Sequence, residues 1–282
     1  MKNKAYRIRK KIRTIILYIV VGLGAIGMLL PFVWMVSISF TESAYYFEYP
    51  PELIPENPSI NNYLRAWTSG NFQHYFMNSV FVTLVSVIFV VLFSAMMAYA
   101  FARLEFPGKE VIFYTIIFVL MVPNMVGIIP QFLLAIKLHL RNSLWGLILF
   151  YISGSIPFNT FLLRGFFETL PHELEDAVLI DGGNYFTIFI KMIIPLSTPA
   201  LATVSIFSLL GFWDEYILSL TLIDDVSKRT LPVAIATYQG QHGTDWGLVF
   251  AASLIAIVPV IALFVSLQRY FVGGLTQGAF KG

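Results

Sequence analysis

Six long runs of apolar residues dominate this sequence and leave few folds open to it. A helix crosses the hydrocarbon core of a membrane with about twenty mostly apolar residues, and it satisfies its own backbone groups there. The hydrophobic share of 57% and the charged share of 12% lie outside the usage of soluble proteins. We predict an all-α integral membrane protein, one domain over residues 1–282, with six transmembrane helices at 15–40, 76–103, 111–135, 144–166, 193–222 and 248–272.

Lysines and arginines are distributed unevenly among the connecting segments. Seven of them precede the first apolar run, which predicts that the basic segment 1–14 lies in the cytoplasm. Because six is an even number, the carboxyl terminus returns to the same side. The predicted orientation leaves on the outside only Arg65, Lys137, Arg141, Lys228 and Arg229 of the 18 lysines and arginines.

A polar segment separates the fourth and fifth apolar runs, and we call residues 167–192 the polar loop. Pro171 fits the first turn of a helix, acidic residues follow at that helix's positive end, and Gly182-Gly183 supplies a break. The pattern predicts a helix, a glycine turn and a second short helix. By the assigned orientation, this helix-turn-helix lies in the cytoplasm.

The first helix of the polar loop is predicted to carry two apolar faces. Leu174 and Val178 share one side, whereas Asp176 lies opposite them with Leu179 and Ile180. We expect one face to dock on the chain's own membrane helices. The other face, with its carboxylate, is then free to enter a groove on a partner.

The polar loop resembles the EAA loop of permease subunits in ATP-binding-cassette importers. The resemblance rests on Asp176-Ala177-Val178, on Asp181-Gly182 and on Pro195-Leu196-Ser197-Thr198-Pro199; Asp176 and Val178 depart from the family's Glu and Ala. In that family the loop docks on the ATPase. The resemblance therefore implies ATPase-coupling roles for Glu175, Asp176, Ala177, Val178, Leu179, Ile180, Asp181 and Gly182.

The tail, residues 273–282, resembles the ending of carbohydrate-type permeases, the relatives of the second permease subunit of the maltose importer. By resemblance, such tails approach the ATPase, which implies contacts from Thr276, Gln277 and Gly278. The resemblance also implies a prokaryotic cell membrane, a second permease subunit, two ATPase subunits and an extracytoplasmic solute-binding protein.

Two predicted outer segments are candidates for contact with an external partner. The first, 41–75, is acidic and rich in proline, and a solvated connector explains it equally well. The second, 223–246, faces the solute receptor in related sugar permeases. Just before it stand the candidate pathway residues Trp213, Asp214 and Glu215, although an aromatic belt and a headgroup position also account for them.

Prolines fall inside two of the predicted spans. Pro123 and Pro130 are expected to interrupt the third span, and Pro157 the fourth. Each frees backbone carbonyl groups, which lipid tolerates only where protein or a water-filled path satisfies them. These positions are either pathway-facing or ordinary membrane-helix prolines.

Several kinds of chemistry lack their sequence patterns. There is no Gly-x-x-x-x-Gly-Lys-Ser/Thr phosphate loop, so we expect no cofactor on this chain, with ATP and Mg bound by a partner ATPase. The four histidines lack metal-site spacing, cysteine is absent, and the basic amino-terminal segment lacks the features of a nucleic-acid surface. We predict a non-catalytic chain in contact with lipid, with no metal and no nucleic-acid partner.

The functional prediction is a permease subunit of a binding-protein-dependent ABC importer, forming half of the pathway for a sugar or oligosaccharide. One alternative is a permease for another solute, such as a glycerol-phosphate-type polyol. Another is an ion-coupled secondary transporter, which would need an ionisable residue near the membrane midplane. Only Asp214 and Glu215 come near to that requirement, and the polar loop would be left unexplained.

Overall fold

The computed structural model describes residues 2–42, 54–68, 71–240 and 243–279. These residues are almost entirely helical, and the one strand pair among them is β1 (Gln239–Gly240) with β2 (Gly243–Thr244), antiparallel. The all-α prediction is confirmed. The chain divides into unit 1, Met1–Gly70 with Thr237–Ile255, and unit 2, Asn71–Ala236 with Ala256–Gly282.

Four described helices are long and apolar enough to cross a membrane, and two bent helix pairs raise the number to six. The bent pairs correspond to the third and fifth predicted spans. The four straight candidates are residues 9–39 of α1 (Lys2–Ser39), all of α3 (Phe72–Arg103), all of α6 (Leu144–Phe167) and residues 246–266 of α13 (Trp246–Ala279).

The third predicted span bends by 94° at the residues around Pro123. Pro123 therefore interrupts the span as expected, but Pro130 does not. Pro130 lies in the first turn of a helix, where its missing N–H has no partner to lose. The segment consists of α4 (Lys109–Phe118), η1 (Val119–Met121), η2 (Asn124–Gly127) and α5 (Ile128–Lys137).

A break was expected at Pro157. This expectation was wrong, because α6 continues through this proline. Pro157 is buried, and α6 packs against α3 in unit 2. Neighbouring helices and small local adjustments satisfy the backbone groups that a proline frees in a membrane helix. Packing therefore overrides the local preference at this position.

The fifth predicted span, 193–222, extended too far at its carboxyl end and contains a bend near its amino end. The chain bends by 77° at Ser197, between α9 and α10, and α10 ends at Trp213. Beyond it, the Glu215 carboxylate accepts hydrogen bonds from the N–H groups of Leu218 and Ser219, so it starts a separate helix. The elements are α8 (Tyr185–Ile188), the π-helical η3 (Phe189–Ile193), α9 (Ile194–Leu196), α10 (Thr198–Trp213) and α11 (Ile217–Leu222).

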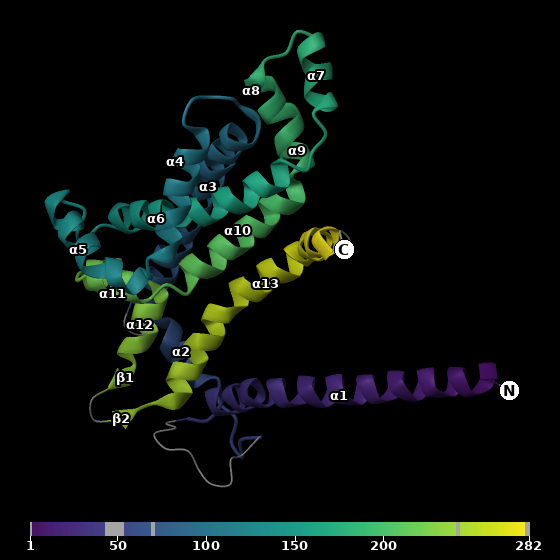
Figure 1. Cartoon of the computed structure of the whole chain (residues 1–282). Coiled ribbons are helices and arrows are strands. Elements are labelled where there is room, and N and C mark those ends of the chain that lie inside the picture. The colour runs from purple at the N-terminus through teal and green to yellow at the C-terminus, as the bar shows by residue number, and fades with distance from the viewer. Residues whose placement is uncertain (1, 43–53, 69–70, 241–242, 280–282) are drawn as a thin grey trace. The chain divides into compact units, whose positions relative to one another are not determined.

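The core of unit 2 lies between α3, α6 and α10 (Figure 1). One cluster of buried side chains includes Val82, Leu147 and Phe212, and a second includes Ala98, Leu163 and Ile193. The second cluster continues into the polar loop, whose helices α7 and α8 lie at the opposite end of unit 2 from α11 (Figure 1). The membrane helices and the polar loop thus share one packed core.

At the α11 end of unit 2, neutral side chains hold the chain between α11 and α12 (Leu231–Thr237). The Asn78 amide donates to the carbonyl oxygens of Ser227 and Arg229, and Asn142 accepts a hydrogen bond from the N–H of Asp225. A short 3₁₀ turn, η4 (Val226–Lys228), lies within this segment.

Unit 1 joins the end of α1 to α2 (Asn61–Thr68) and to the first turns of α13. The buried Asn62 amide donates to the carbonyl oxygens of Ser39 and Thr41, 3.0 and 2.8 Å away. Arg65 forms an ion pair of 3.0 Å with Asp245, which is the residue before α13. The predicted loop 41–75 thus contains a helix fixed by buried polar contacts.

Candidate functional site

The first helix of the polar loop is α7 (Glu173–Ile180), which starts two residues after Pro171 instead of at it. Gly182 has a φ of 82° directly after the helix cap Asp181. Its N–H donates to the carbonyl of Leu179, and the N–H of Gly183 donates to that of Val178. This is the hydrogen-bond pattern of a Schellman motif, so the glycine turn ends α7 as the sequence predicted.

The second glycine of the turn is required by space. A Cβ atom on Gly183 would lie 2.6 Å from Val178 Cγ1 and 2.8 Å from the Val178 carbonyl oxygen. After the turn, the Asn184 side chain accepts a hydrogen bond of 2.9 Å from the N–H of Thr187 and thereby caps α8. Both helices of the loop therefore have fixed ends.

The inner face of α7 carries a buried carboxylate that the sequence analysis placed with the coupling residues. Glu175 Oε1 lies 3.0 Å from Arg103 Nε at the end of α3, without the alignment of a hydrogen bond. The two side chains are 10% and 1% exposed. A charged pair at this depth needs its partner, since an isolated buried charge is strongly unfavourable.

Arg103 also binds the end of α6 and the residues that follow it. Its Nη2 donates to the carbonyl oxygens of Phe167 and Leu170, each at 2.6 Å. Its Nη1 lies 2.8 and 3.0 Å from the two ring nitrogens of His172. A single arginine at the end of α3 thus contacts both the end of α6 and the start of α7.

The outer face of α7 is exposed and carries the predicted coupling residues. Asp176, Leu179 and Ile180 are all exposed, with Ile180 at 85%. Two aromatic residues that we did not predict, Tyr185 and Phe186 on α8, are exposed beside the same turn. We call these five residues the docking face; it combines one carboxylate with four large apolar side chains.

The remaining coupling candidates are divided between the two sides of the loop. Val178 packs against the buried cluster as predicted, but Leu174 is 42% exposed, because Glu175 takes the inward position. Ala177 and Gly182 are exposed at the surface of the loop. Within the described residues the Asp181 carboxylate accepts no hydrogen bond, so backbone groups alone close the turn.

The three candidate pathway residues have different surroundings. Trp213 is buried, donates its indole N–H to the carbonyl of Ala256 and packs edge-on against Phe76. Asp214 is exposed. Glu215 is half-buried and accepts a hydrogen bond of 2.8 Å from Tyr151 Oη in addition to its bonds with α11. A pathway role for the three stays a prediction.

The candidate tail contacts Thr276, Gln277 and Gly278 fall outside the residues whose side chains the structure describes. Their backbone belongs to α13, which continues to Ala279, past the predicted end of the sixth span at residue 272. Their contact with an ATPase also stays a prediction.

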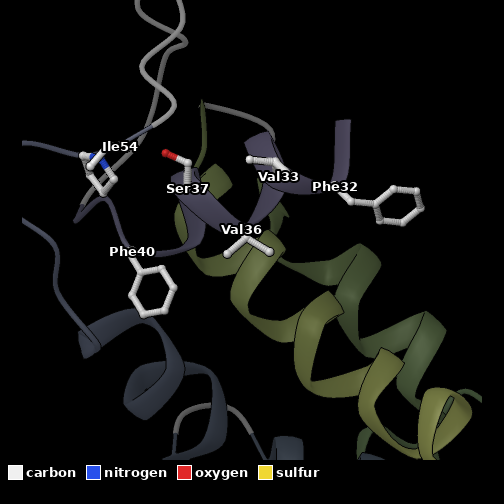
Figure 2. A pocket seen from close by; sticks show the side chains of 7 residues that line it. Phe32, Val33, Val36, Ser37, Phe40 and Ile54 are labelled. Carbon is white, nitrogen blue, oxygen red and sulfur yellow. The ribbon is translucent and has the colours of Figure 1, made fainter. Parts of the chain in front are cut away.

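A pocket in unit 1 is lined almost entirely by apolar side chains (Figure 2). It lies along the last turns of α1 and includes none of the predicted site residues. Elsewhere in the described chain, no group of three or more histidine, aspartate or glutamate residues is placed to hold a metal ion. The residues that form the pocket are Phe32, Val33, Val36, Ser37, Phe40, Ile54 and Pro55.

The sequence did not predict the pairing of Arg103 with α7. Arg103 is the last residue of an apolar helix, and it was counted there only as one of the cytoplasmic positive charges. The sequence shows only a single arginine at the end of a long apolar run and an acidic helix more than sixty residues later in the chain. No local pattern predicts that the two meet, because the pairing depends on how α3 and α6 pack.

Comparison with known proteins was made on sequence and on structure. Residues 91–277 match the family model described as "Binding-protein-dependent transport system inner membrane component". The diacetylchitobiose uptake system permease protein of Streptomyces coelicolor is 35% identical over 261 residues, 92% of this chain and 86% of that protein. The trehalose/maltose transport system permease protein of Thermococcus litoralis is 33% identical over 276 residues, 96% of this chain and 98% of that protein.

A solved structure has the same fold. A chain from the crystal structure of a bacterial ABC transporter involved in the import of the acidic polysaccharide alginate superposes with a TM-score of 0.82 at 26% sequence identity. The match covers 93% of this chain and 97% of that one. The similarity therefore extends over both units and includes the polar loop.

Proposed function

The chain belongs to the family of inner membrane components of binding-protein-dependent transport systems, and we propose that it forms half of the pathway of a sugar or oligosaccharide importer. It is a multi-pass inner-membrane permease of an ABC transporter and not an enzyme. Support for the sugar class comes from the relatives, whose names specify diacetylchitobiose, trehalose or maltose, and galactooligosaccharides. Full-length similarity to these permeases displaces the ion-coupled alternative.

The observation that carries the mechanism is the docking face of α7 and α8. It places Asp176 among exposed apolar side chains on a loop whose inner face is packed against the membrane helices. A soluble surface seldom leaves such a patch without a partner. We infer that the patch binds an ATPase subunit, so that movement of the ATPase is transmitted to the helices.

The proposed assembly contains this chain, a second permease, two ATPase subunits and an extracytoplasmic solute-binding protein. ATP and Mg bind to the ATPase subunits, and this chain binds no cofactor. Both termini and the polar loop lie in the cytoplasm, which the basic segment 1–14 supports. ATP-driven closure of the ATPase pair would then switch the pathway between outward and inward access.

The test is reconstitution of the four-component complex and its binding protein in proteoliposomes. Radiolabelled diacetylchitobiose, trehalose and maltose are offered in turn, and uptake is measured with and without internal ATP. We expect ATP- and receptor-dependent uptake of at least one of them. Uptake by this chain alone, without an ATPase, would contradict the proposal, and so would a receptor that binds only non-carbohydrate solutes.

Asp176→Ala tests the docking face directly. A charge-assisted hydrogen bond contributes about 1.5–3 kcal/mol, so uptake per ATP hydrolysed should fall roughly ten- to hundredfold while the apolar contacts still permit assembly. Asp176→Glu keeps the charge and should behave nearly as the wild type. Glu173→Gln removes an exposed charge from the same helix and is the matched control. Wild-type coupling in Asp176→Ala would remove Asp176 from the mechanism.

A further inference from the structure

Arg103, the last residue of α3, contacts the end of α6 and the first turn of α7 through one side chain. Its guanidinium binds the carbonyl oxygen of Phe167, the last residue of α6, and that of Leu170 just after it, and lies against the Glu175 carboxylate on α7. The side chain is 1% exposed, although it belongs to the last residue of a membrane helix. These contacts use Nη2 and Nε, and the third nitrogen, Nη1, lies 2.8 and 3.0 Å from the two ring nitrogens of His172.

The geometry of the contacts requires arginine. The planar guanidinium presents five N–H donors in a fixed fork, whereas an ammonium group is a compact point charge with three rotatable donors. Only the fork reaches the Phe167 and Leu170 carbonyls from one nitrogen while another nitrogen lies against Glu175. The cation also suits the negative end of α6, whose last carbonyl groups lack helical partners.

The two adjacent acids of α7 therefore have different surroundings. Asp176 is exposed on the docking face, while Glu175 is turned inward against Arg103. Apolar contacts alone would let α7 slide or tilt against α3, because they are not directional. The ion pair and the two carbonyl contacts fix the helix at a defined point.

We propose that Arg103 is the positioning residue that clamps the polar loop to α3 and α6, so that a displacement imposed on α7 moves the ends of both helices with it. This inference rests on the proposed function of the docking face. Glu175 is the anchor of the clamp on α7. Without the clamp, α7 still binds the ATPase, but its movement is absorbed within the loop instead of reaching the pathway.

The first test separates coupling from assembly. Arg103→Lys keeps the charge and loses the fork, and Glu175→Gln keeps the shape of the anchor and loses its charge. In the reconstituted complex with its receptor and the transported sugar found above, both should assemble and hydrolyse ATP near the wild-type rate. Uptake per ATP should fall about tenfold, the size expected from one buried charge-assisted contact.

Two control variants match the change in charge. Glu173→Gln removes an exposed acid from α7. Glu168→Gln removes one of the two acidic partners of Arg164, with which it forms an ion pair of 2.7 Å at the same end of α6, and leaves the other, Glu110. Both should leave coupling unchanged. If Arg103→Lys and Glu175→Gln lowered ATPase activity and uptake in proportion, or if the controls uncoupled equally, the clamp would be wrong.

The second test observes the linkage directly and needs no identified sugar. The chain has no cysteine, so spin labels at Glu173→Cys on α7 and Met96→Cys on α3 are unique within it; both side chains are exposed. Their distance distribution is measured by pulsed electron resonance in the assembled complex, whose other subunits carry no reactive cysteine, with and without a non-hydrolysable ATP analogue and Mg²⁺.

We expect one narrow distribution in both states of the clamped protein and a broader, nucleotide-dependent one in Arg103→Lys. A distribution that Arg103→Lys leaves narrow and unchanged would overturn the clamp while leaving the docking proposal intact. Failure of the complex to assemble with any ATPase would instead contradict the proposed function. The two failures are therefore distinguishable.

Discussion

The two ends of unit 2 each carry a loop with an arginine–carboxylate pair, and the pairs differ in burial. At the polar loop, Arg103 and Glu175 are 1% and 10% exposed, whereas Arg141 and Asp224 at the α11 end are 46% and 57% exposed. Exposed pairs contribute little, because water screens them, while breaking a buried pair leaves an uncompensated charge. The same residue types thus fix one loop strongly and the other weakly.

The α11 end relies on neutral groups in place of a buried charge. Asn142 has a φ of 58°, its N–H donates to the carbonyl of Leu222, and its side-chain oxygen accepts from the N–H of Asp225. These are neutral hydrogen bonds to backbone groups of a distant segment of the chain, each of modest strength. Under the proposed function, the buried pair of the polar loop would carry the movement of the ATPase to the membrane helices, whereas the other loop has no such pair.

The two arginines are replaced by alanine in turn, and the largest loss of stability is expected for the buried one. Arg103→Ala leaves Glu175 buried without its partner and should destabilise the fold by about 3–5 kcal/mol. Arg141→Ala should cost about 0–1 kcal/mol. Thermal unfolding of the purified complex measures both, and equal shifts of the two variants would break the comparison.

A second effect tests the glycine turn. Gly183→Ala forces a Cβ atom to within 2.6 Å of Val178 Cγ1, and overpacking of this kind costs about 1–3 kcal/mol. Gly165→Ala, on α6 with open space around it, is the matched control and should be neutral or slightly stabilising. Limited proteolysis of the polar loop should accelerate only in Gly183→Ala; an unchanged digestion pattern would contradict the steric argument.

The sequence predicted those features that depend on local physics. Apolar runs predicted the spans, and Gly182-Gly183 predicted the end of α7, because a left-handed residue after a helix favours glycine. The break at Pro123 was also predicted, because proline has no N–H to donate within a helix and frees a backbone carbonyl group. Each of these signals is complete within a few residues.

The features that sequence analysis missed depend on residues far apart in the chain. Pro130 and Pro157 have the same local tendency as Pro123 to break a helix. Neither breaks one, because Pro130 lies in the first turn of α5 and Pro157 is buried within the packed helix α6. Glu175 and Asp176 are adjacent acids, and only the position of Arg103 decides which one turns inward. The docking face was therefore predicted in outline, and the clamp behind it was not.

An effect of similar size is expected at Asn142, whose left-handed conformation is unfavourable for residues with a Cβ. Asn142→Ala should cost about 1–3 kcal/mol, because it adds backbone strain to the lost bond with Asp225. Asn142→Gly loses only that bond and should cost less. Thermal unfolding compares the two, and an equal cost would show that the backbone conformation contributes nothing.

The smallest effect concerns Asp225, beside the exposed pair. Hydrogen bonds from the Ser227 hydroxyl and N–H hold the pKa of this carboxyl below its ordinary value of 3.8, with Lys228 nearby as a further cause. A lowered folded-state pKa stabilises the loop fully above the unfolded value, and the contribution is lost as the pH falls through the folded value. Asp225→Asn should therefore loosen residues 225–228 slightly at pH 7, and the difference should shrink as the pH falls through the lowered pKa of the folded state.

Hydrogen exchange of the amides in 225–228 provides the measurement, expressed as the ratio of variant to wild-type rates at each pH. The ratio should exceed one at pH 7 by less than about threefold, since an exposed charge contributes little, and it should fall toward one as the pH is lowered through the folded-state pKa. For the amides of α7, the ratio of variant to wild-type exchange rates should be one at every pH measured. A ratio that rose on acidification would reverse the sign of the argument, and a large effect at pH 7 would make the two ends of unit 2 alike.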